Sequence, residues 1–256
     1  MALQFPYWIE IGSTSIHPHL LFEVLGYLAG ISLTIWVSST GRDSVSPGQR
    51  HPLIVAGLIG ALIGAKILAW AQHPQTTLLA VTDEPVLLFG GKTIVGGLLG
   101  GMAGIELAKK ALGIEKRTGD ALVIPLAVGM SLGRVGCFLS GLEDGTYGVA
   151  TSLPWGVDFG DGVFRHPTQL YEIIAIWAIV LGIKYRSERE KVPSGWCFRA
   201  YLMSYLLWRL LVDWIKPTDW ELLFLSPIQI ACVLGLVWYL TLGVMSEEEW
   251  AAQGDG

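Results

Sequence analysis

Long apolar runs separated by short polar connections dominate the chain. Each run approaches the roughly 20 residues that a helix needs to cross a bilayer, so the pattern predicts about seven membrane spans. The predicted spans are Leu20–Val37, Leu53–Ala71, Thr93–Leu112, Ala121–Ser140, Thr168–Tyr185, Cys197–Ile215 and Ser226–Val244. We therefore predict an all-α, polytopic membrane protein with a single integral membrane domain over residues 1–256.

Basic residues follow every second predicted span. They cluster after the first, third and fifth spans, as Arg42 and Arg50, then Lys109, Lys110, Lys116 and Arg117, then Lys184, Arg186, Arg189 and Lys191. Connections rich in Lys and Arg stay on the cytoplasmic side of a membrane. The pattern therefore predicts an N-terminus outside, an outer loop region over residues 141–167, and an acidic cytoplasmic tail over residues 245–256.

With this orientation, almost all ionisable residues in or just beside the predicted spans fall in the outer half of the membrane. They are Glu23, Lys66, Lys92, Arg134, Tyr171, Glu172, Arg209, Asp213 and Lys216. Ionisable groups inside a membrane are costly and are kept mainly where they pair or line a polar cavity. Their convergence favours a functional site that faces the outer leaflet.

Composition agrees with a membrane protein and narrows the chemistry. The 256 residues are 52% hydrophobic and only 15% charged, which makes nucleic acid an unexpected partner. The five histidines are dispersed along the chain, and the three cysteines show no metal-ligand spacing. Nucleotide and phosphate-loop motifs are also missing. We therefore expect no metal and no cofactor, and we interpret Cys137 as a small buried apolar residue.

The predicted sixth span carries a polar stripe. Tyr205, Arg209, Asp213 and Lys216 recur at spacings of four, four and three, which places them on one helical face. Two explanations fit this stripe equally well. In one, Arg209 and Asp213 form a structural ion pair and Lys216 extends to the lipid headgroups. In the other, the stripe binds a ligand. Arg134, on another span, favours the ligand site, because planar guanidinium groups match a phosphodiester. At that depth the natural ligand is a phospholipid headgroup.

The predicted outer loop adds further titratable groups. Glu143 and Asp144 come soon after Arg134, and the segment "RHPTQLYE" carries His166, Tyr171 and Glu172 at the start of the fifth span. An imidazole at this point is either a proton acceptor or an interfacial hydrogen-bonding group. Both interpretations stay open from these residues alone.

Four segments of the chain resemble the prolipoprotein diacylglyceryl transferase family. "GRVGCFL", followed by an acidic residue, resembles the family signature "GRxGNFxNxE", and "RHPTQLYE" is similar to its "RHPSQLYE". "YLLWRLLVDWIKP" resembles its "YGxxRxxxExxRxPD", and "GGKTIVGGLLGG" resembles its "GGMSxHGGLIG". The order and spacing of the four segments match over nearly the whole chain.

This resemblance implies a reaction at the outer leaflet of a bacterial plasma membrane. The diacylglyceryl group of phosphatidylglycerol would move to the thiol of the lipobox cysteine in a preprolipoprotein signal peptide. The resemblance implies that Arg134 and Arg209 hold the phosphate and stabilise the leaving glycerol phosphate. Glu143 or His166 would assist proton transfer. Further substrate contacts would come from Tyr171, Glu172, Tyr205, Asp213 and Lys216.

The sequence also departs from the family pattern. Val95 stands at the position of the family histidine, Cys137 and Ser140 replace the two asparagines of the signature, and the glutamate is shifted by one to Glu143. Two alternatives follow. One is a related phospholipid-modifying transferase with a different acceptor, and the other is a transporter, since intramembrane charges also mark transport paths.

Overall fold

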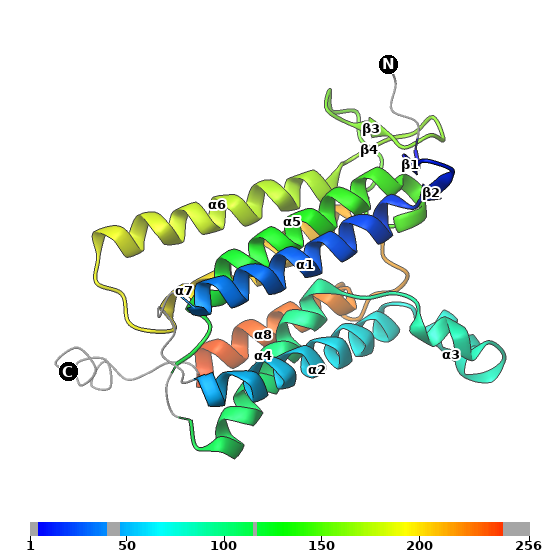
Figure 1. Ribbon diagram of the computed structural model, residues 1–256. Helices are drawn as coiled ribbons and strands as arrows, with labels where there is room; N and C mark the ends of the chain where they lie inside the picture. The colour runs from blue at the N-terminus through cyan, green and yellow to red at the C-terminus, as the bar shows by residue number, and fades with distance from the viewer. Residues whose placement is uncertain (1–4, 40–46, 115–116, 243–256) are drawn as a thin grey trace. The chain divides into compact units, whose positions relative to one another are not determined.

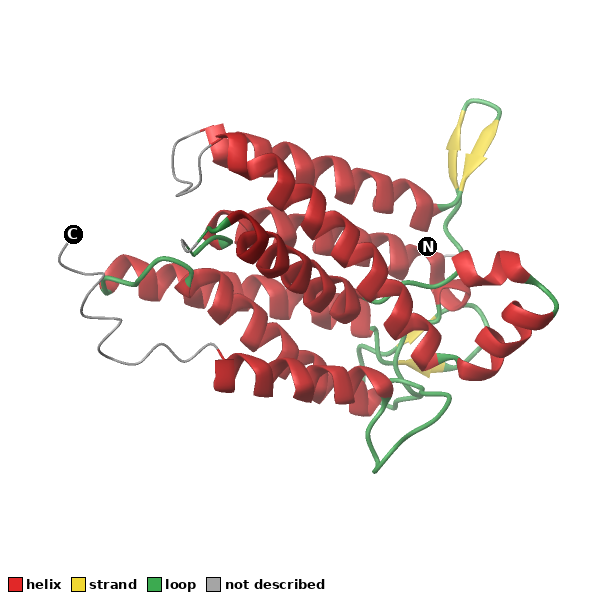
Figure 2. Cartoon of the chain, turned by 90° about the horizontal axis from the view of Figure 1, so that it is seen from below, coloured by secondary structure: helices red, strands yellow, loops and turns green. Residues whose placement is uncertain are grey.

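The computed structural model describes residues 5–39, 47–114 and 117–242 of the chain, and its regular structure there is mainly helical (Figures 1 and 2). The eight α-helices of this part are α1 (Pro18–Ser39), α2 (Pro47–Gln72), α3 (Pro74–Thr82), α4 (Ile94–Leu112), α5 (Val123–Ser140), α6 (Thr168–Arg189), α7 (Trp196–Val212) and α8 (Pro227–Leu242). The prediction of a helical protein is confirmed. The predicted tail over residues 245–256, together with Arg42 and Lys116, lies outside the described residues.

Short elements connect the helices. Two antiparallel hairpins pair β1 (Ile9–Ile11) with β2 (Thr14–Ile16) and β3 (Val157–Asp158) with β4 (Phe164–Arg165). Four 3₁₀ turns complete the set: η1 (Pro85–Phe89), η2 (Asp120–Leu122), η3 (Gly141–Asp144) and η4 (Asp213–Ile215).

Each predicted span corresponds to a helix, with two differences. Helix α7 ends at Val212, and the predicted sixth span continues only as the 3₁₀ turn η4. Helix α3 was not predicted, because its 9 residues are too few to form a span. By length and composition, four helical segments in the described part are able to cross a membrane: Pro18–Val37, Gly48–Gln72, Asp120–Asp144 and Thr168–Arg189.

Large apolar side chains cover the outside of these helices. For example, Ile35, Leu62 and Leu181 are 62%, 61% and 62% exposed. An exterior of this kind is unfavourable in water and favourable against lipid tails. The protein is therefore a multi-pass membrane protein.

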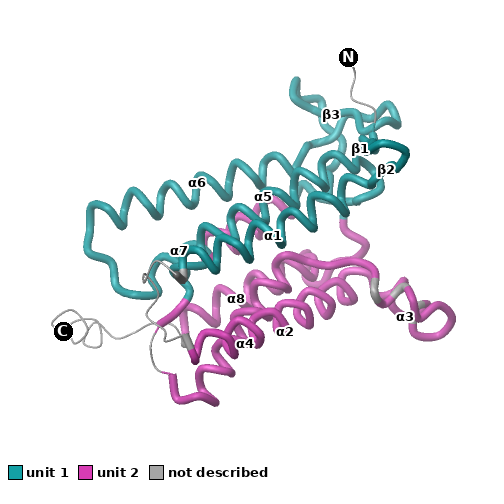
Figure 3. The backbone as a smooth tube through the Cα atoms, in the orientation of Figure 1, with its two compact units in different colours: residues 1–43, 119–201, 214–217 teal, residues 44–118, 202–213, 218–256 magenta. Residues whose placement is uncertain are grey.

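The chain divides into two compact units (Figure 3). Unit 1 comprises residues 1–43, 119–201 and 214–217, and in it helix α5 packs against both α1 and α6. Unit 2 comprises residues 44–118, 202–213 and 218–256, and in it α2 packs along α4 while α8 contacts both.

Glycines bring the helix pairs into close contact in each unit. In unit 2, a Cβ atom on Gly64 would lie 2.3 Å from the carbonyl oxygen of Gly96 and 2.9 Å from the Cα of Gly100. In unit 1, a Cβ atom on Gly26 would lie 2.8 Å from the carbonyl oxygen of Gly129. Small residues spaced four apart, such as Gly60 and Gly64 in α2 and Gly96 and Gly100 in α4, allow this backbone contact within a membrane.

The end of α5 also depends on glycine. Gly141 terminates the helix with a φ of +63°, a conformation that favours glycine, and a Cβ atom there would lie 2.7 Å from the Cβ of Phe5. The chain thus turns sharply into η3, which carries Glu143 and Asp144.

We predict that Gly64→Ala destabilises unit 2, because the added methyl group overlaps the α4 backbone and forces the helices apart. Overpacking of this kind costs about 1–3 kcal/mol. The temperature of unfolding in detergent should fall clearly below that of the unmodified protein. The matched control is Gly182→Ala in α6, where no atom lies within 4 Å of the added Cβ. Equal unfolding temperatures for the two variants would contradict the proposed contact.

Candidate functional site

A buried ion pair between α5 and α6 lies at the centre of the candidate site in unit 1. Nε of Arg134 lies 2.9 Å from Oε1 of Glu172, and the two side chains are only 8% and 1% exposed. Buried charges are stable only when they are paired and hydrogen-bonded. The structure thus brings together two of the residues that the sequence predicted to meet in the outer half of the membrane.

The turn after α5 places two carboxylates beside the start of α1. Nε2 of His17 lies 3.0 Å from Glu143, and Nδ1 of His19 lies 2.6 Å from Oδ1 of Asp144. Glu143 remains 56% exposed, whereas Asp144 is only 7% exposed. The two acidic residues, adjacent in sequence, therefore have different partners and different access to solvent.

Cys137 lies next to this second pair. Its Sγ atom is 3.9 Å from Nδ1 of His19 and 3.8 Å from Nη1 of Arg134. The side chain is buried, as predicted, but its surroundings are polar and not simply apolar. The potential ligand atoms of His19, Cys137 and Asp144 all lie within 4.8 Å of one another.

The sequence shows no metal-ligand spacing, whereas the structure brings these three potential ligands together. His19 and Cys137 are 118 residues apart, so no local spacing reveals their contact. The available signal was the segment "HPH" at the outer start of one span and "ED" at the outer end of another.

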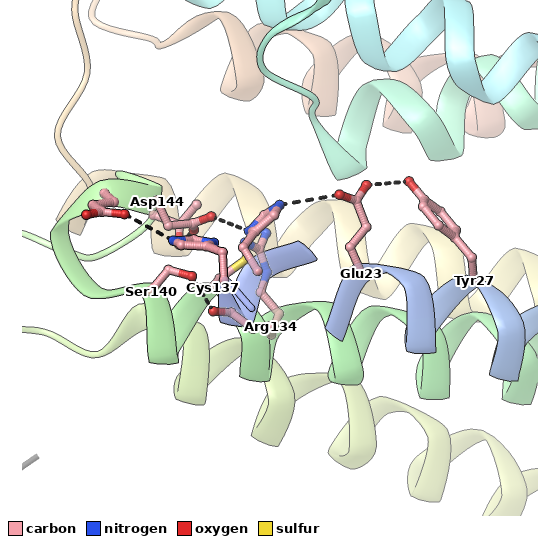
Figure 4. A network of polar contacts seen from close by, with 11 residues as sticks. Glu23, Tyr27, Arg134, Cys137, Ser140 and Asp144 are labelled. Carbon is pink, nitrogen blue, oxygen red and sulfur yellow. Dashed lines mark hydrogen bonds and ion pairs between the residues drawn. The ribbon is translucent and has the colours of Figure 1, made fainter. Parts of the chain in front are cut away.

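A polar chain continues from this cluster along α1 (Figure 4). Oε2 of Glu23 lies 3.6 Å from Nε2 of His19, and the hydroxyl of Tyr27 donates a 2.9 Å hydrogen bond to Oε1 of the same carboxylate. Ser140 is bonded to its own helix, where its hydroxyl donates to the carbonyl oxygen of Gly136 at 2.8 Å. The side chains of Glu23 and Ser140 are therefore both held by hydrogen bonds, and Figure 4 shows Cys137 between them.

The loop before α6 orders a second group of predicted residues. Nδ1 of His166 lies 3.2 Å from the hydroxyl of Tyr171, and the indole of Trp155 donates to that hydroxyl at 2.7 Å. The backbone N–H of His166 donates to the carbonyl oxygen of Val149. The structure therefore brings His166 and Tyr171 together at the start of α6.

An exposed ion pair closes the adjoining β3–β4 hairpin. Nη1 and Nη2 of Arg165 each donate a 2.7 Å hydrogen bond to Asp161. These bonds lower the pKa of the Asp161 carboxyl below its ordinary value and raise the pKa of the Arg165 guanidinium. The pair holds Arg165 in place, and Arg165 is the residue immediately before His166.

Tyr205 and Arg209 of α7 and Asp213 of η4 belong to unit 2. Nη2 of Arg209 donates to Oδ1 of Asp213 at 3.0 Å, and the hydroxyl of Ser226 donates to the other oxygen of that carboxylate. Tyr205 is fully buried. Helix α7 ends at Val212, so Asp213 lies in η4, and Lys216 follows η4 in a segment assigned to unit 1.

Val95 lies at the position of the family histidine. It is 1% exposed in the first turn of α4, behind the N-cap Thr93, whose side chain accepts a hydrogen bond from the N–H of Gly96. An apolar side chain at this position takes no part in proton transfer.

Comparison with known proteins identifies the family of the chain. The family described as prolipoprotein diacylglyceryl transferase matches residues 6–246. A phosphatidylglycerol–prolipoprotein diacylglyceryl transferase of Geobacter sulfurreducens is 28% identical over 251 residues, which cover 93% of this chain and 94% of the relative. A protein of the same name from Trichormus variabilis is 29% identical, over 93% of this chain and 87% of the relative. Another from Vibrio atlanticus is 27% identical, over 95% of this chain and 93% of the relative. Because the family match spans almost all of its length, the chain belongs to the prolipoprotein diacylglyceryl transferase family.

Proposed function

We propose that this protein transfers the diacylglyceryl group of phosphatidylglycerol to the thiol of a lipobox cysteine in a preprolipoprotein. The membership of the family over residues 6–246 supports this activity. The observation that carries it is the buried guanidinium of Arg134, held by Glu172 in a helical unit with an apolar exterior. A fixed cation at this place is suited to an anionic lipid headgroup.

The proposed chemistry is a displacement at carbon. The acceptor thiolate attacks the glyceryl carbon that bears the phosphate, a carbon–sulfur bond forms, and the carbon–oxygen bond to the phosphate breaks. Glycerol phosphate leaves with the electron pair of that bond. Negative charge grows on the leaving phosphate, and a preorganised guanidinium stabilises this charge in the transition state. We assign this role to Arg134.

Arg209 carries a second proposed phosphate contact, implied by the family resemblance. Within unit 2, the guanidinium of Arg209 is oriented by its hydrogen bond to the Asp213 carboxylate, and the hydroxyl of Ser226 holds that carboxylate by a second hydrogen bond. Tyr205, Asp213 and Lys216 stay predicted substrate-binding residues, as do Tyr171 and Glu172. In unit 1, Glu172 acts through Arg134, whose position it fixes.

Two groups are candidates for accepting the thiol proton. Glu143 is the more exposed carboxylate of η3, and His166 is supported by Tyr171. A thiol with a pKa of about 8.5 requires only modest activation, and carboxylate and imidazole groups are both common proton acceptors in enzymes. With valine at position 95, the family histidine cannot supply this function.

A different acceptor is the second candidate function. Val95 and Cys137 occupy positions where the family pattern has histidine and asparagine, so the sequence departs from that pattern at the base and at a headgroup-binding amide. The lipid-binding Arg134 is retained. A related transferase with the same lipid donor and another acceptor would have these features.

We further propose an outside N-terminus and seven spans. The support is the placement of basic residues after alternate helices, such as Arg186 and Arg189 in the last turn of α6. The loop of residues 141–167 would then face the outside of the plasma membrane, where the lipobox cysteine arrives.

The purified protein should add a diacylglyceryl mass to a lipobox peptide in the presence of phosphatidylglycerol. We expect Arg134→Lys to lower kcat/KM by about 10²-fold, because lysine keeps the charge but loses the planar bidentate geometry. Mass spectrometry of the peptide provides the measurement. Arg186→Ala, which removes an exposed arginine paired with Glu190, is the matched control and should retain full activity. Peptide that stays unmodified while the lipid is consumed would favour a different acceptor.

The proton acceptor can be identified from the dependence of kcat/KM on pH. Replacing the true base, by Glu143→Gln or His166→Gln, should lower kcat/KM by about 10²-fold at neutral pH. The loss should shrink as pH rises toward the pKa of the acceptor thiol, since the thiolate then forms without a base. Losses below about threefold in both variants would exclude both assignments.

Labelling of introduced cysteines tests the proposed orientation. In a variant without Cys137, Cys197 and Cys232, Val163→Cys should react with a membrane-impermeant maleimide in intact cells. Glu188→Cys, which replaces an exposed residue near the end of α6, should react only after the cells are permeabilised. The opposite pattern would contradict the orientation.

A further inference from the structure

The cluster of His19, Cys137 and Asp144 lies entirely within unit 1. It combines one imidazole nitrogen, one thiol sulfur and one carboxylate oxygen within 4.8 Å of one another. Nδ1 of His19 is the shared neighbour, 2.6 Å from Asp144 and 3.9 Å from Cys137. None of these three residues was assigned a role in the proposed transfer reaction.

The backbone explains why these residues meet. A Cβ atom on Gly136 would lie 3.2 Å from the carbonyl oxygen of Pro18 and 3.3 Å from the Cα of His19. The missing side chain therefore allows the first turn of α1 to approach α5 next to Cys137. The positive φ of Gly141 then turns the chain so that Asp144 comes back to the same place.

We propose that His19, Cys137 and Asp144 form a binding site for a divalent transition-metal ion of the zinc type. Nitrogen, thiolate and carboxylate donors are the ligands that zinc uses in proteins. Three protein ligands leave one position of a tetrahedral ion open, as in zinc sites that bind water or a substrate. A thiolate and a carboxylate together balance the double charge of the ion.

Neighbouring groups orient the three ligands. Thr146 donates a hydrogen bond to Oδ2 of Asp144, which leaves Oδ1 directed at the cluster. When Nδ1 of His19 binds a metal, its Nε2 carries the proton, and Oε2 of Glu23 lies 3.6 Å from that atom. The hydroxyl of Tyr27 holds this carboxylate in turn (Figure 4). Carboxylates behind metal-binding histidines are a regular part of such sites.

The nearby charges are compatible with a cation. Arg134 lies 3.8 Å from the sulfur, but its ion pair with Glu172 balances its charge. Binding of the ion requires the thiolate form of Cys137 and an Nδ1 atom of His19 that carries no proton, so protons are released and the affinity falls as the pH falls. Access is available from the side of His19, whose side chain is 38% exposed.

Metal content of the purified full chain tests this proposal without any activity assay, so its outcome is separate from that of the transferase reaction. Protein in detergent is incubated with Zn²⁺, desalted, and analysed by elemental mass spectrometry. We expect about one zinc per chain, and an affinity at least tenfold lower in Cys137→Ser, His19→Gln and Asp144→Asn. Cys197→Ser, which changes a free cysteine outside the cluster, is the matched control and should bind as the unmodified protein does.

Two further measurements use the unmodified chain, so a variant that fails to fold does not decide the outcome. Co²⁺ in place of zinc should give a sulfur-to-metal charge-transfer absorption band, which reports ligation by a thiolate. Zn²⁺ should also protect Cys137 from alkylation, as read from the mass of its peptide. Folded protein that retains no zinc would overturn the proposal. So would full zinc retention by Cys137→Ser, a missing band, or unchanged alkylation.

Discussion

The buried ion pair between Arg134 and Glu172 is the constraint on which the arrangement of unit 1 depends. Both charges are shielded from solvent, and each would be costly to bury without the other. Loss of one partner would leave an uncompensated charge, at a cost of about 3–5 kcal/mol. The pair therefore joins α5 to α6 and also keeps a cation at one fixed point of the helical unit.

Close packing of helices makes this pair and its neighbours possible. Glycines at the contacts of α1 with α5 allow the backbones to approach, so short side chains such as Cys137 and Asp144 reach groups on another helix. The polar groups then contact one another directly, within a helical unit whose outer surface is apolar. In the same way, the hydroxyl of Tyr27 holds the carboxylate of Glu23, and Asp144 holds the imidazole of His19.

Much of the architecture follows from the sequence. The apolar runs of the sequence locate seven of the eight α-helices in the described part of the chain, because a helix that crosses lipid needs a long continuous run of apolar residues. The end of α7 at Val212 was missed, since hydropathy does not respond to a change from an α-helix to a 3₁₀ turn. The short helix α3 was missed because nine residues carry too little periodicity.

The candidate site was only partly predictable. Arg134 and Glu172 stood out because charges within spans are rare. His19 was interpreted as one of several dispersed histidines, and its partners Cys137 and Asp144 lie more than 100 residues away. Contacts of that range depend on the backbone geometry at Gly136 and Gly141, which has no local signature in the sequence.

The central claim is that a fixed guanidinium assists the departure of glycerol phosphate from the lipid. Phosphatidylglycerol labelled with carbon-13 in its terminal glycerol tests this claim directly when both products are followed by mass spectrometry. We expect one labelled glycerol phosphate for each peptide thioether formed, with both products lost together when Arg134 is replaced. A labelled headgroup that stays on the lipid while the peptide gains only fatty acyl chains would contradict it.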